Sequence, residues 1–450
     1  MYKITLAFKY FIKRKITYFA VLAVTLCVFI VAVVMTVTTD LYGDFIEKNH
    51  SFAGDCVIGT DSLVGFAYYE DFVKILAQQK EIASVSPVIK SFALVRQRGS
   101  NEDDAIEIMG IDPDTYSKVT GYANTLYYNR KNVSDVFKLS YDPNLTGCVL
   151  GDTMTRDDDI VYPDKSTVPG IRFSISCFPL NTYGALAQAG TDLVNSKTFY
   201  LSDLSNTGLP RVDGSIMYLP FDEAQKLCGM AGPASPTKRI SQIQIKFAPS
   251  VKIKKGAELV RSLWDKYKLE KQNETQAFLL NTVTVQSWKE FRRESIAPME
   301  NEQAELILMF GFVGLTTVFI VLVVFYMIIS HKSKDIGILK SIGVSKRSII
   351  ELFSIFAFLV GLLSSVIGLF AGWIFLVNVN RIEDWLYHRY GFQLWNRNIY
   401  AIGDIPNRIN FTVLAVVAVA AILACLIGAF FPSYQAARKA PADILQVNQL

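Results

Sequence analysis

LILMFGFVGLTTVFIVLVVFYMIIS, residues 306–330, is an unbroken apolar stretch that contains no charged side chain. A helix needs about 20 apolar residues to cross the hydrocarbon core of a bilayer. Three other stretches of this chain also reach that length without a charge: Thr17–Thr39, Leu352–Asn380 and Phe411–Ala437. Charged residues make up only 19% of the 450, below the roughly 25% that is usual in soluble domains. The sequence therefore predicts a membrane protein with four transmembrane helices.

The first stretch follows Lys13-Arg14-Lys15, which also suits a secretory signal peptide. Its apolar run is longer than the roughly 7–15 residues of a signal-peptide core, and no A-x-A cleavage site follows it. We therefore expect a retained membrane anchor.

The distribution of charge predicts the orientation, because Lys and Arg near span ends favour the cytoplasmic side. The segment before the first span, the loop between spans two and three, and the tail after span four lie on one side if the spans alternate. Their net charges add to +9, whereas residues 40–302 carry 29 Lys and Arg against 34 Asp and Glu. We expect both termini and the middle loop in the cytoplasm, and the long insert outside.

The insert, residues 40–304, mixes strand and helix patterns and predicts an α+β extracytoplasmic domain. Helices are expected at Tyr69–Gln79, Phe221–Leu227 and Lys254–Lys266, and strands at Ile106–Ile111, Ser215–Tyr218 and Ile240–Phe247. Residues Val85–Val95 partly alternate and contain Pro87, which predicts short strands separated by turns.

Nothing in the insert requires a cofactor or a metal. Disulfides are permitted outside the cytoplasm, but Cys56, Cys148, Cys177 and Cys228 fit small buried residues equally well. The run Asp157-Asp158-Asp159 lacks the spaced oxygen ligands of a calcium loop, and we interpret it as a solvated turn. Basic clusters such as residues 252–255 indicate the solvent-exposed side of a helix and not a surface that binds nucleic acid.

The spans favour helix packing over an ion pathway. Small residues in the third span allow close approach of helices, namely Gly361, Ser364, Ser365, Gly368 and Gly372. No span carries an acidic or basic side chain in its interior, which disfavours a proton-coupled transporter. We expect a loop at Arg381–Asn410, whose aromatic residues suit the outer membrane interface: Trp385, Tyr387, Trp395 and Tyr400.

The middle loop, HKSKDIGILKSIGVSKRSII at residues 331–350, predicts a short amphipathic helix. Its apolar face would be formed by Ile336, Ile338, Leu339 and Ile342. Gly343 would end the helix, and Ser345 would cap the helix that enters span three. Taken alone, the same segment also fits a basic connector that contacts anionic lipids.

Several motifs resemble those of FtsX-like permeases, the membrane subunits of MacB-type ABC transporters. KSKDIGILKSIGVSKRSI is similar to the hallmark segment of that family, and LAFKYFIKRK and FFPSYQAARKAPADILQ are similar to its start and end. VSPVIKSFALV, IMGIDPDTYS, GSIMYLPFDEAQKL, VQSWKEF and IYAIGDIPNRINF resemble the lipoprotein-releasing, Lol-type transmembrane subunits.

The resemblance implies an α-helical membrane protein that is not itself an enzyme and holds no cofactor. It implies a domain at 1–39 with an amphipathic helix and the first span, an α+β domain at 40–304, and a permease domain at 305–450 with a coupling helix at 332–343. ATP hydrolysis would occur on a separate cytoplasmic ATPase dimer, in keeping with the absence of a GxxxxGK[ST] motif. The residues implied in ATPase coupling are Lys334, Asp335, Gly337, Lys340 and Gly343.

The implied activity is mechanotransmission, in which ATPase closure moves the outer domain and lipoproteins are released from the inner membrane. Acyl chains would meet the upper ends of spans one and two, near residues 34–38 and 306–309. Implied partners are a second copy or a paralogous membrane subunit, lipoprotein cargo, a periplasmic carrier and membrane lipids. Two alternatives stay open: the same architecture serving peptide or drug export or signalling to cell-wall hydrolases, and an anchored extracytoplasmic enzyme or receptor. The absence of GxSxG and HExxH motifs weakens the enzyme alternative.

Overall fold

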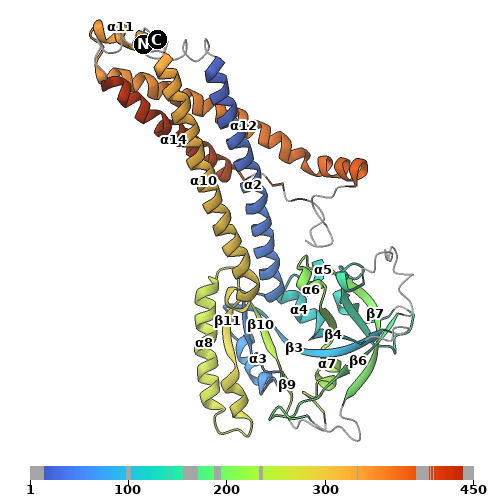
Figure 1. Ribbon diagram of the computed structural model, residues 1–450. Coiled ribbons are helices and arrows are strands. Elements are labelled where there is room, and N and C mark those ends of the chain that lie inside the picture. The colour runs from blue at the N-terminus through green and yellow to red at the C-terminus, as the bar shows by residue number, and fades with distance from the viewer. Residues whose placement is uncertain are drawn as a thin grey trace. The chain divides into compact units, whose positions relative to one another are not determined.

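The computed structural model describes residues 15–97, 103–139, 141–155, 171–186, 194–232, 237–331, 333–391, 405, 407–408 and 410–438 (Figure 1). The chain divides into two compact units. We call residues 1–43, 298–395 and 404–450 the membrane unit, and residues 44–297 and 396–403 the sheet unit.

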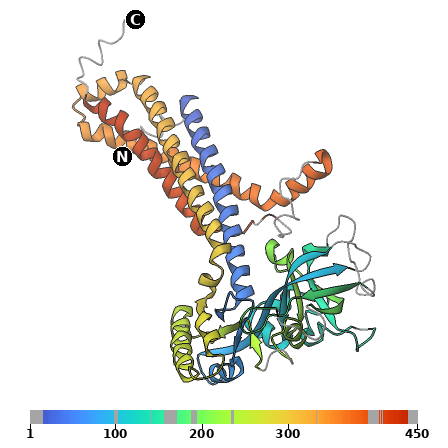
Figure 2. The same cartoon turned by 60° about the horizontal axis from the view of Figure 1, so that its bottom comes forward.

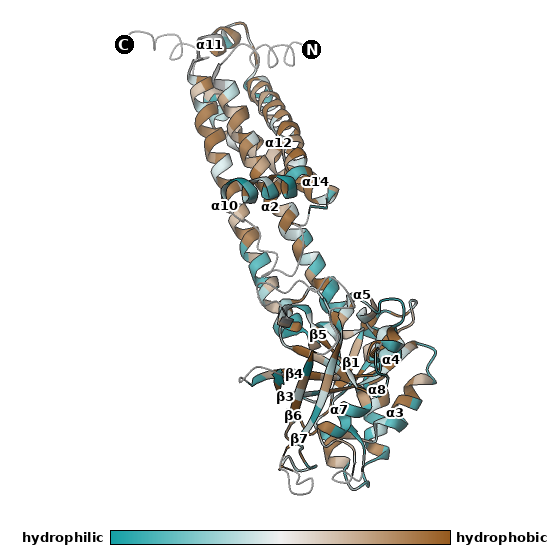
Figure 3. Ribbon diagram, turned by 90° about the vertical axis from the view of Figure 1, so that its right-hand side faces the viewer, coloured by the Kyte–Doolittle hydropathy of each residue, from teal (hydrophilic) through white to brown (hydrophobic). Residues whose placement is uncertain are grey.

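Four long helices and one short helix build the membrane unit. The long ones are α2 (Lys15–Ala53), α10 (Arg293–His331), α12 (Lys346–Tyr390) and α14 (Phe411–Arg438), and the short one is α11 (Ser333–Ser341). Each long helix is long and apolar enough to cross a membrane, and Figure 3 shows hydrophobic residues along all four. The prediction of four membrane helices is confirmed.

Small residues bring these helices into close contact, as predicted from the third span. A Cβ on Gly368 of α12 would lie 2.8 Å from the carbonyl oxygen of Thr25 in α2. On the same helix, the Ser364 hydroxyl donates to the Val21 carbonyl at 3.2 Å. A Cβ on Gly361 would lie 3.1 Å from Cα of Ile422 in α14. Larger side chains at these positions would push the helices apart.

The expected loop at Arg381–Asn410 is wrong in its first third. Helix α12 continues to Tyr390 and ends at Gly391, which has a φ of +66°. The reason is local: residues 381–390 contain neither Gly nor Pro, and Gly391 is the first residue suited to a left-handed helix end. Trp385 and Tyr387 therefore lie exposed on a helix, whereas Trp395 and Tyr400 lie outside the described residues.

The sheet unit contains a nine-stranded mixed sheet in the order β11-β1-β10-β3-β4-β8-β5-β7-β6. Its strands are β1 (Cys56–Gly59), β3 (Ile82–Gln97), β4 (Asp104–Ile111), β5 (Gly147–Gly151), β6 (Arg172–Cys177), β7 (Asn195–Ser205), β8 (Ile216–Pro220), β10 (Gln242–Phe247) and β11 (Thr284–Ser287). A second sheet pairs β2 (Phe66–Ala67) with β9 (Arg239–Ile240). The helices of the unit are α3 (Tyr69–Ala77), α4 (Pro113–Val119), α5 (Tyr122–Thr125), α6 (Pro210–Asp213), α7 (Phe221–Leu227), α8 (Ile253–Glu270) and α9 (Trp288–Phe291).

Strand β3 organises this sheet because it has three partners. Its first half pairs with β10, its second half pairs with β6 through Leu94–Gln97, and β4 lies along its other edge. The strands from β3 through β4, β8, β5 and β7 to β6 therefore close into a ring. The prediction of short strands at 85–95 is wrong: Pro87 is tolerated because the β3–β4 ladder begins only at Val88.

Helices α3 and α8 cover the apolar face next to β1 and β10, and can be followed in Figures 1 and 2. Trp264 of α8 lies edge-on to Phe72 of α3, with 4.8 Å between ring centroids. The amphipathic patterns that predicted these two helices are confirmed, since Phe72 and Trp264 are buried.

Asp55, just before β1, is a buried carboxylate with three donors. It accepts from His50 Nε2 at 2.7 Å, from the Phe247 amide at 2.8 Å and from Lys246 Nζ at 3.1 Å. Burial alone would raise its pKa, but these donors outweigh burial and hold the pKa below its usual value. Such a group adds stability above the unfolded pKa of about 3.9, and that stability is lost as the pH falls through the folded value.

Asp55→Asn is therefore expected to make the stability of the protein depend less on pH in the acidic range. Between pH 6 and pH 3 the variant should lose less thermal stability than the wild type, while at pH 6 it should be less stable by about 1–3 kcal/mol. Calorimetry of the full chain in detergent measures both. Asp61→Asn, at an exposed position, should keep the wild-type slope, and an identical slope in Asp55→Asn would contradict the assignment.

Candidate ATPase-coupling segment and membrane cavity

Helix α11 packs against the ends of α10, α12 and α14 through Ile336. Ile336 is buried in a cluster with Ile329 of α10, Ile349 and Phe353 of α12, and Ala436 and Ala437 of α14. The predicted apolar face is only partly correct: Leu339 is half-buried, while Ile338 and Ile342 are 51% and 76% exposed. Two large apolar side chains thus lie uncovered on this short helix and its terminating turn.

The turn after α11 has the predicted geometry. Gly343 has a φ of +97°, which an L side chain rarely adopts. Its amide donates to the Lys340 carbonyl, and the Val344 amide donates to the Leu339 carbonyl, each at 3.0 Å. Ser345 then caps α12, its hydroxyl accepting from the Ser348 amide at 3.3 Å. Both the Gly stop and the Ser cap are confirmed.

The five predicted coupling residues lie on one helix and its terminating turn. Lys334 and Asp335 belong to α11, but their side chains lie outside the described part of the structure. Gly337 is buried. Lys340 is half-buried, and desolvation together with the charge of Lys346 lowers its pKa. The large apolar side chains exposed here are Ile338 on α11 and Ile342 in the turn that follows it, both of which the sequence assigned to the apolar face.

A cavity of about 380 Å³ lies between α2, α10 and α14. Its wall is almost entirely apolar and includes Met35 and Ile307, which fall in the two span ends that the sequence singled out. Sequence reasoning missed the contribution of α14, through Val416, Ala420 and Ala424. Gly311 and Gly314 leave the space open, because a Cβ on either would meet no atom within 4 Å.

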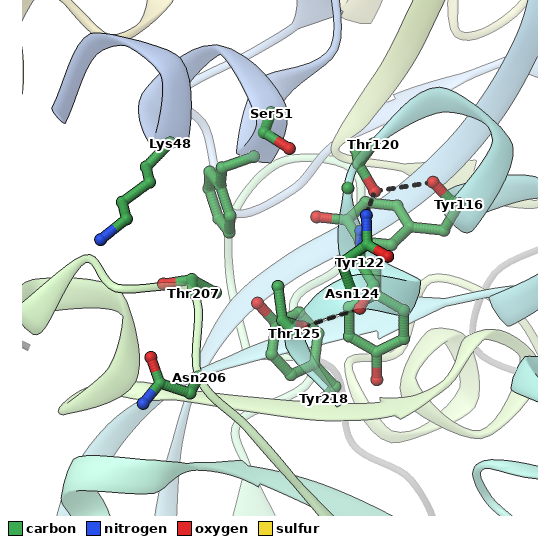
Figure 4. A pocket seen from close by; sticks show the side chains of 12 residues that line it. Lys48, Ser51, Tyr116, Thr120, Tyr122, Asn124, Thr125, Asn206, Thr207 and Tyr218 are labelled. Carbon is green, nitrogen blue, oxygen red and sulfur yellow. Dashed lines mark hydrogen bonds between the residues drawn. The ribbon is translucent and has the colours of Figure 1, made fainter. Parts of the chain in front are cut away.

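The sheet unit contains a smaller cavity of about 200 Å³ beside the last turns of α2 (Figure 4). Several of the polar side chains around it are hydrogen-bonded within the chain. Thr120 and Thr125 donate to the carbonyls of Tyr116 and Tyr122, at 2.7 and 2.8 Å. Thr207 donates to Asp213 at 2.8 Å. These bonds tie the wall together, whereas the buried hydroxyls of Tyr122 and Tyr218, also in the wall, have no partner among the described residues.

All six cysteines are free thiols. Burial raises the pKa of Cys56 to about 12, so it is unreactive at neutral pH. Among the described residues, no group of His, Cys, Asp and Glu could hold a metal. The run Asp157-Asp158-Asp159 lies outside the described residues.

The comparisons with known proteins point to one family. The profile of the FtsX-like permease C-terminal family matches residues 307–441. The lipoprotein-releasing system transmembrane protein LolC of Neisseria meningitidis serogroup B is 21% identical over 382 residues, 84% of this chain and 81% of that protein. A LolC of Xylella fastidiosa is 26% identical over 120 residues, 27% of this chain and 29% of that protein. The periplasmic region of MacB from Actinobacillus actinomycetemcomitans aligns at 15% identity with a TM-score of 0.33, over 56% of this chain and 96% of that one.

The matched region 307–441 begins in α10 and contains α11, α12, the turn at Gly343 and α14. It therefore includes the whole candidate coupling segment and two of the three helices around the membrane cavity. Residues 307–441 thus resemble the C-terminal region of FtsX-like permeases, and the chain is similar along most of its sequence to LolC, a transmembrane protein of a lipoprotein-releasing system.

Proposed function

We propose that this chain couples ATP hydrolysis on a separate cytoplasmic ATPase dimer to the release of lipoproteins from the outer leaflet of the inner membrane. The observation that carries the coupling is that α11 and its terminating turn expose the side chains of Ile338 and Ile342, within the segment matched by the permease family. An exposed apolar pair flanked by Lys340 and Lys346 suits a protein partner better than water.

The proposal includes an orientation in the membrane and a role for each domain. Both termini and α11 would be cytoplasmic, as the basic charge of the short segments favours. Residues 1–39 would form the first helical segment, 40–304 the periplasmic domain, and 305–450 the permease domain with its coupling helix at 332–343. A second copy or a paralogous subunit would complete the transporter, and a periplasmic carrier would receive the cargo.

The cavity between α2, α10 and α14 supports lipoprotein as the cargo. Its wall offers hydrocarbon and small residues, which suits an acyl chain and not a hydrophilic solute. The similarity to LolC, a protein of a lipoprotein-releasing system, favours the same class of cargo.

Filling this cavity tests the proposal. In Gly314→Leu the new side chain would enter space that no atom occupies, so we expect the protein to fold and to retain its ATPase partner. Lipoprotein release from proteoliposomes that contain the ATPase should fall at least about tenfold, because about 1.4 kcal/mol of lost acyl-chain binding has that effect.

Gly43→Leu is the matched control. Gly43 lies on α2, is exposed, and also has no atom within 4 Å of an added Cβ, yet it does not line the cavity. Release by this variant should equal that of the wild type. If Gly314→Leu releases lipoproteins at the wild-type rate, acyl chains do not use this cavity; export of a peptide or drug by the same vesicles would then favour the alternative transport function.

A further inference from the structure

A third cavity, of about 260 Å³, lies in the sheet unit and differs in character from the other two. Its floor is the sheet face formed by β10, β3 and β4, which contributes Gln242, Gln244, Lys90 and Glu107. Its rim includes Arg211 of α6 and Arg292, between α9 and α10. These strands are labelled in Figure 1. The wall is mostly polar, so hydrophobic packing alone does not account for the residues that surround it.

Arg292 forms no ion pair with the described residues, although the charge of Glu107 acts on it. Its Nε donates to Asn49 Oδ1 at 2.9 Å, and its guanidinium lies 5.0 Å from the centroid of the Phe52 ring. No carboxylate of the described residues lies within salt-bridge distance of it, and Glu107 is already paired with Lys90 at 3.2 Å. Desolvation lowers the pKa of Arg292. Charges withdrawn from water are normally paired. The lining carries three basic side chains, Lys90, Arg211 and Arg292, against the two carboxylates of Glu107 and Glu294, so the cavity has an excess of one positive charge.

Two glutamines on the floor have unused hydrogen-bonding capacity. Gln242 is 5% exposed and its Oε1 has no partner among the described residues. Gln244 is fully buried. Its side chain is close enough to the Tyr116 hydroxyl to act on the pKa of that tyrosine. The side-chain amide of Gln244 nevertheless makes no hydrogen bond of good geometry with the described residues. A buried amide without a partner costs about 1–3 kcal/mol, so such groups usually serve a purpose.

We propose that this cavity binds a carboxylate carried on a peptide. Arg292 and Arg211 supply planar guanidinium groups, which match the two oxygens of a carboxylate. Gln242 and Gln244 each combine a donor with an acceptor, which is what an adjacent peptide group requires. The cavity volume admits one acidic side chain with neighbouring backbone. This site is separate from the acyl-chain cavity and does not depend on the proposed cargo.

Fluorescence anisotropy of the full chain in detergent tests the inference. The probe is a fluorescein-labelled peptide of alternating glycine and glutamate, compared with the same peptide carrying glutamine in place of glutamate. We expect the acidic peptide to bind the wild type at least about tenfold more tightly, and its affinity to fall as salt is raised. Equal affinity for the two peptides would overturn the proposal.

Arg211→Gln is the informative variant, because Arg211 is exposed and its loss should not prevent folding. It should weaken binding of the acidic peptide about fivefold or more, and Gln242→Leu should weaken it further. Arg293→Gln, one residue beyond Arg292 and also exposed, does not line the cavity and should bind as the wild type does. Equal losses in Arg211→Gln and Arg293→Gln would contradict the site. If millimolar inorganic phosphate displaces the peptide completely, the cavity is a general anion site, and the peptide assignment is overturned.

Discussion

Gly343→Val is expected to release the ATPase from the transporter. Valine at a φ of +97° is strained by about 1–3 kcal/mol, and the turn can relieve that strain only by changing its backbone angles. The two hydrogen bonds that close α11, from Gly343 and Val344, would then be disturbed, and Ile338 and Ile342 would be displaced from the partner surface. A change of about 1.4 kcal/mol in docking corresponds to a tenfold loss. We expect the ATPase recovered with the purified chain to fall at least about tenfold.

Gly391→Val is the control for this experiment. Gly391 ends the same helix that Ser345 begins, has a φ of +66°, and like Gly343 has no atom within 4 Å of an added Cβ. Its substitution should cause similar strain at the other end of α12 and leave ATPase recovery unchanged. Lys340→Glu adds a second test, since it reverses a charge on α11 without altering the turn. Normal ATPase recovery with both Gly343→Val and Lys340→Glu would show that the ATPase docks elsewhere.

Local signals were enough to predict the end of α11 and the start of α12. A glycine that ends a helix and a serine that caps the following helix act through the backbone of a single turn, so both can be recognised from the local sequence. The structure has both features, at Gly343 and Ser345. The exposure of Ile338 and Ile342 could not be predicted, because an apolar residue at helical spacing looks the same whether it packs inward or meets a partner. Of the expected apolar face, Ile336 is buried against α10, α12 and α14, and Leu339 is half-buried.

Long-range pairing limits what could be predicted of the sheet unit. The patterns of α3, α7 and α8 were recognisable because helical periodicity is local. The closure of β3 onto β6, far apart in sequence, has no local signature, and Pro87 led to the wrong expectation of broken strands. The membrane cavity was found only in part for the same reason: two span ends were identified, but the contribution of α14 depends on how the helices pack.

Arg239 shows the same limit most clearly. Nothing around it in the sequence distinguishes it from a surface arginine, yet its side chain is fully buried, and desolvation lowers its pKa. Its guanidinium donates to the carbonyl of Val64 at 2.8 Å, of Leu180 at 2.7 Å and of Gly229 at 2.8 Å. One side chain thus joins three loops that no strand pairing connects.

Arg239→Met is expected to be among the most destabilising single changes in the sheet unit. Methionine fills much of the volume but donates no hydrogen bond, so three carbonyls would lose their donor, for a total of about 3–5 kcal/mol. In a unit of this size, this corresponds to a fall in Tm of roughly 6–20 °C, which calorimetry of the full chain in detergent can measure. Arg172→Met is the matched control: Arg172 on β6 is half-buried and makes no side-chain hydrogen bond or ion pair with the residues that the structure describes. Its Tm should change by no more than about 2 °C. Equal shifts in the two variants would show that the three carbonyls find other donors and that Arg239 does not hold these loops together.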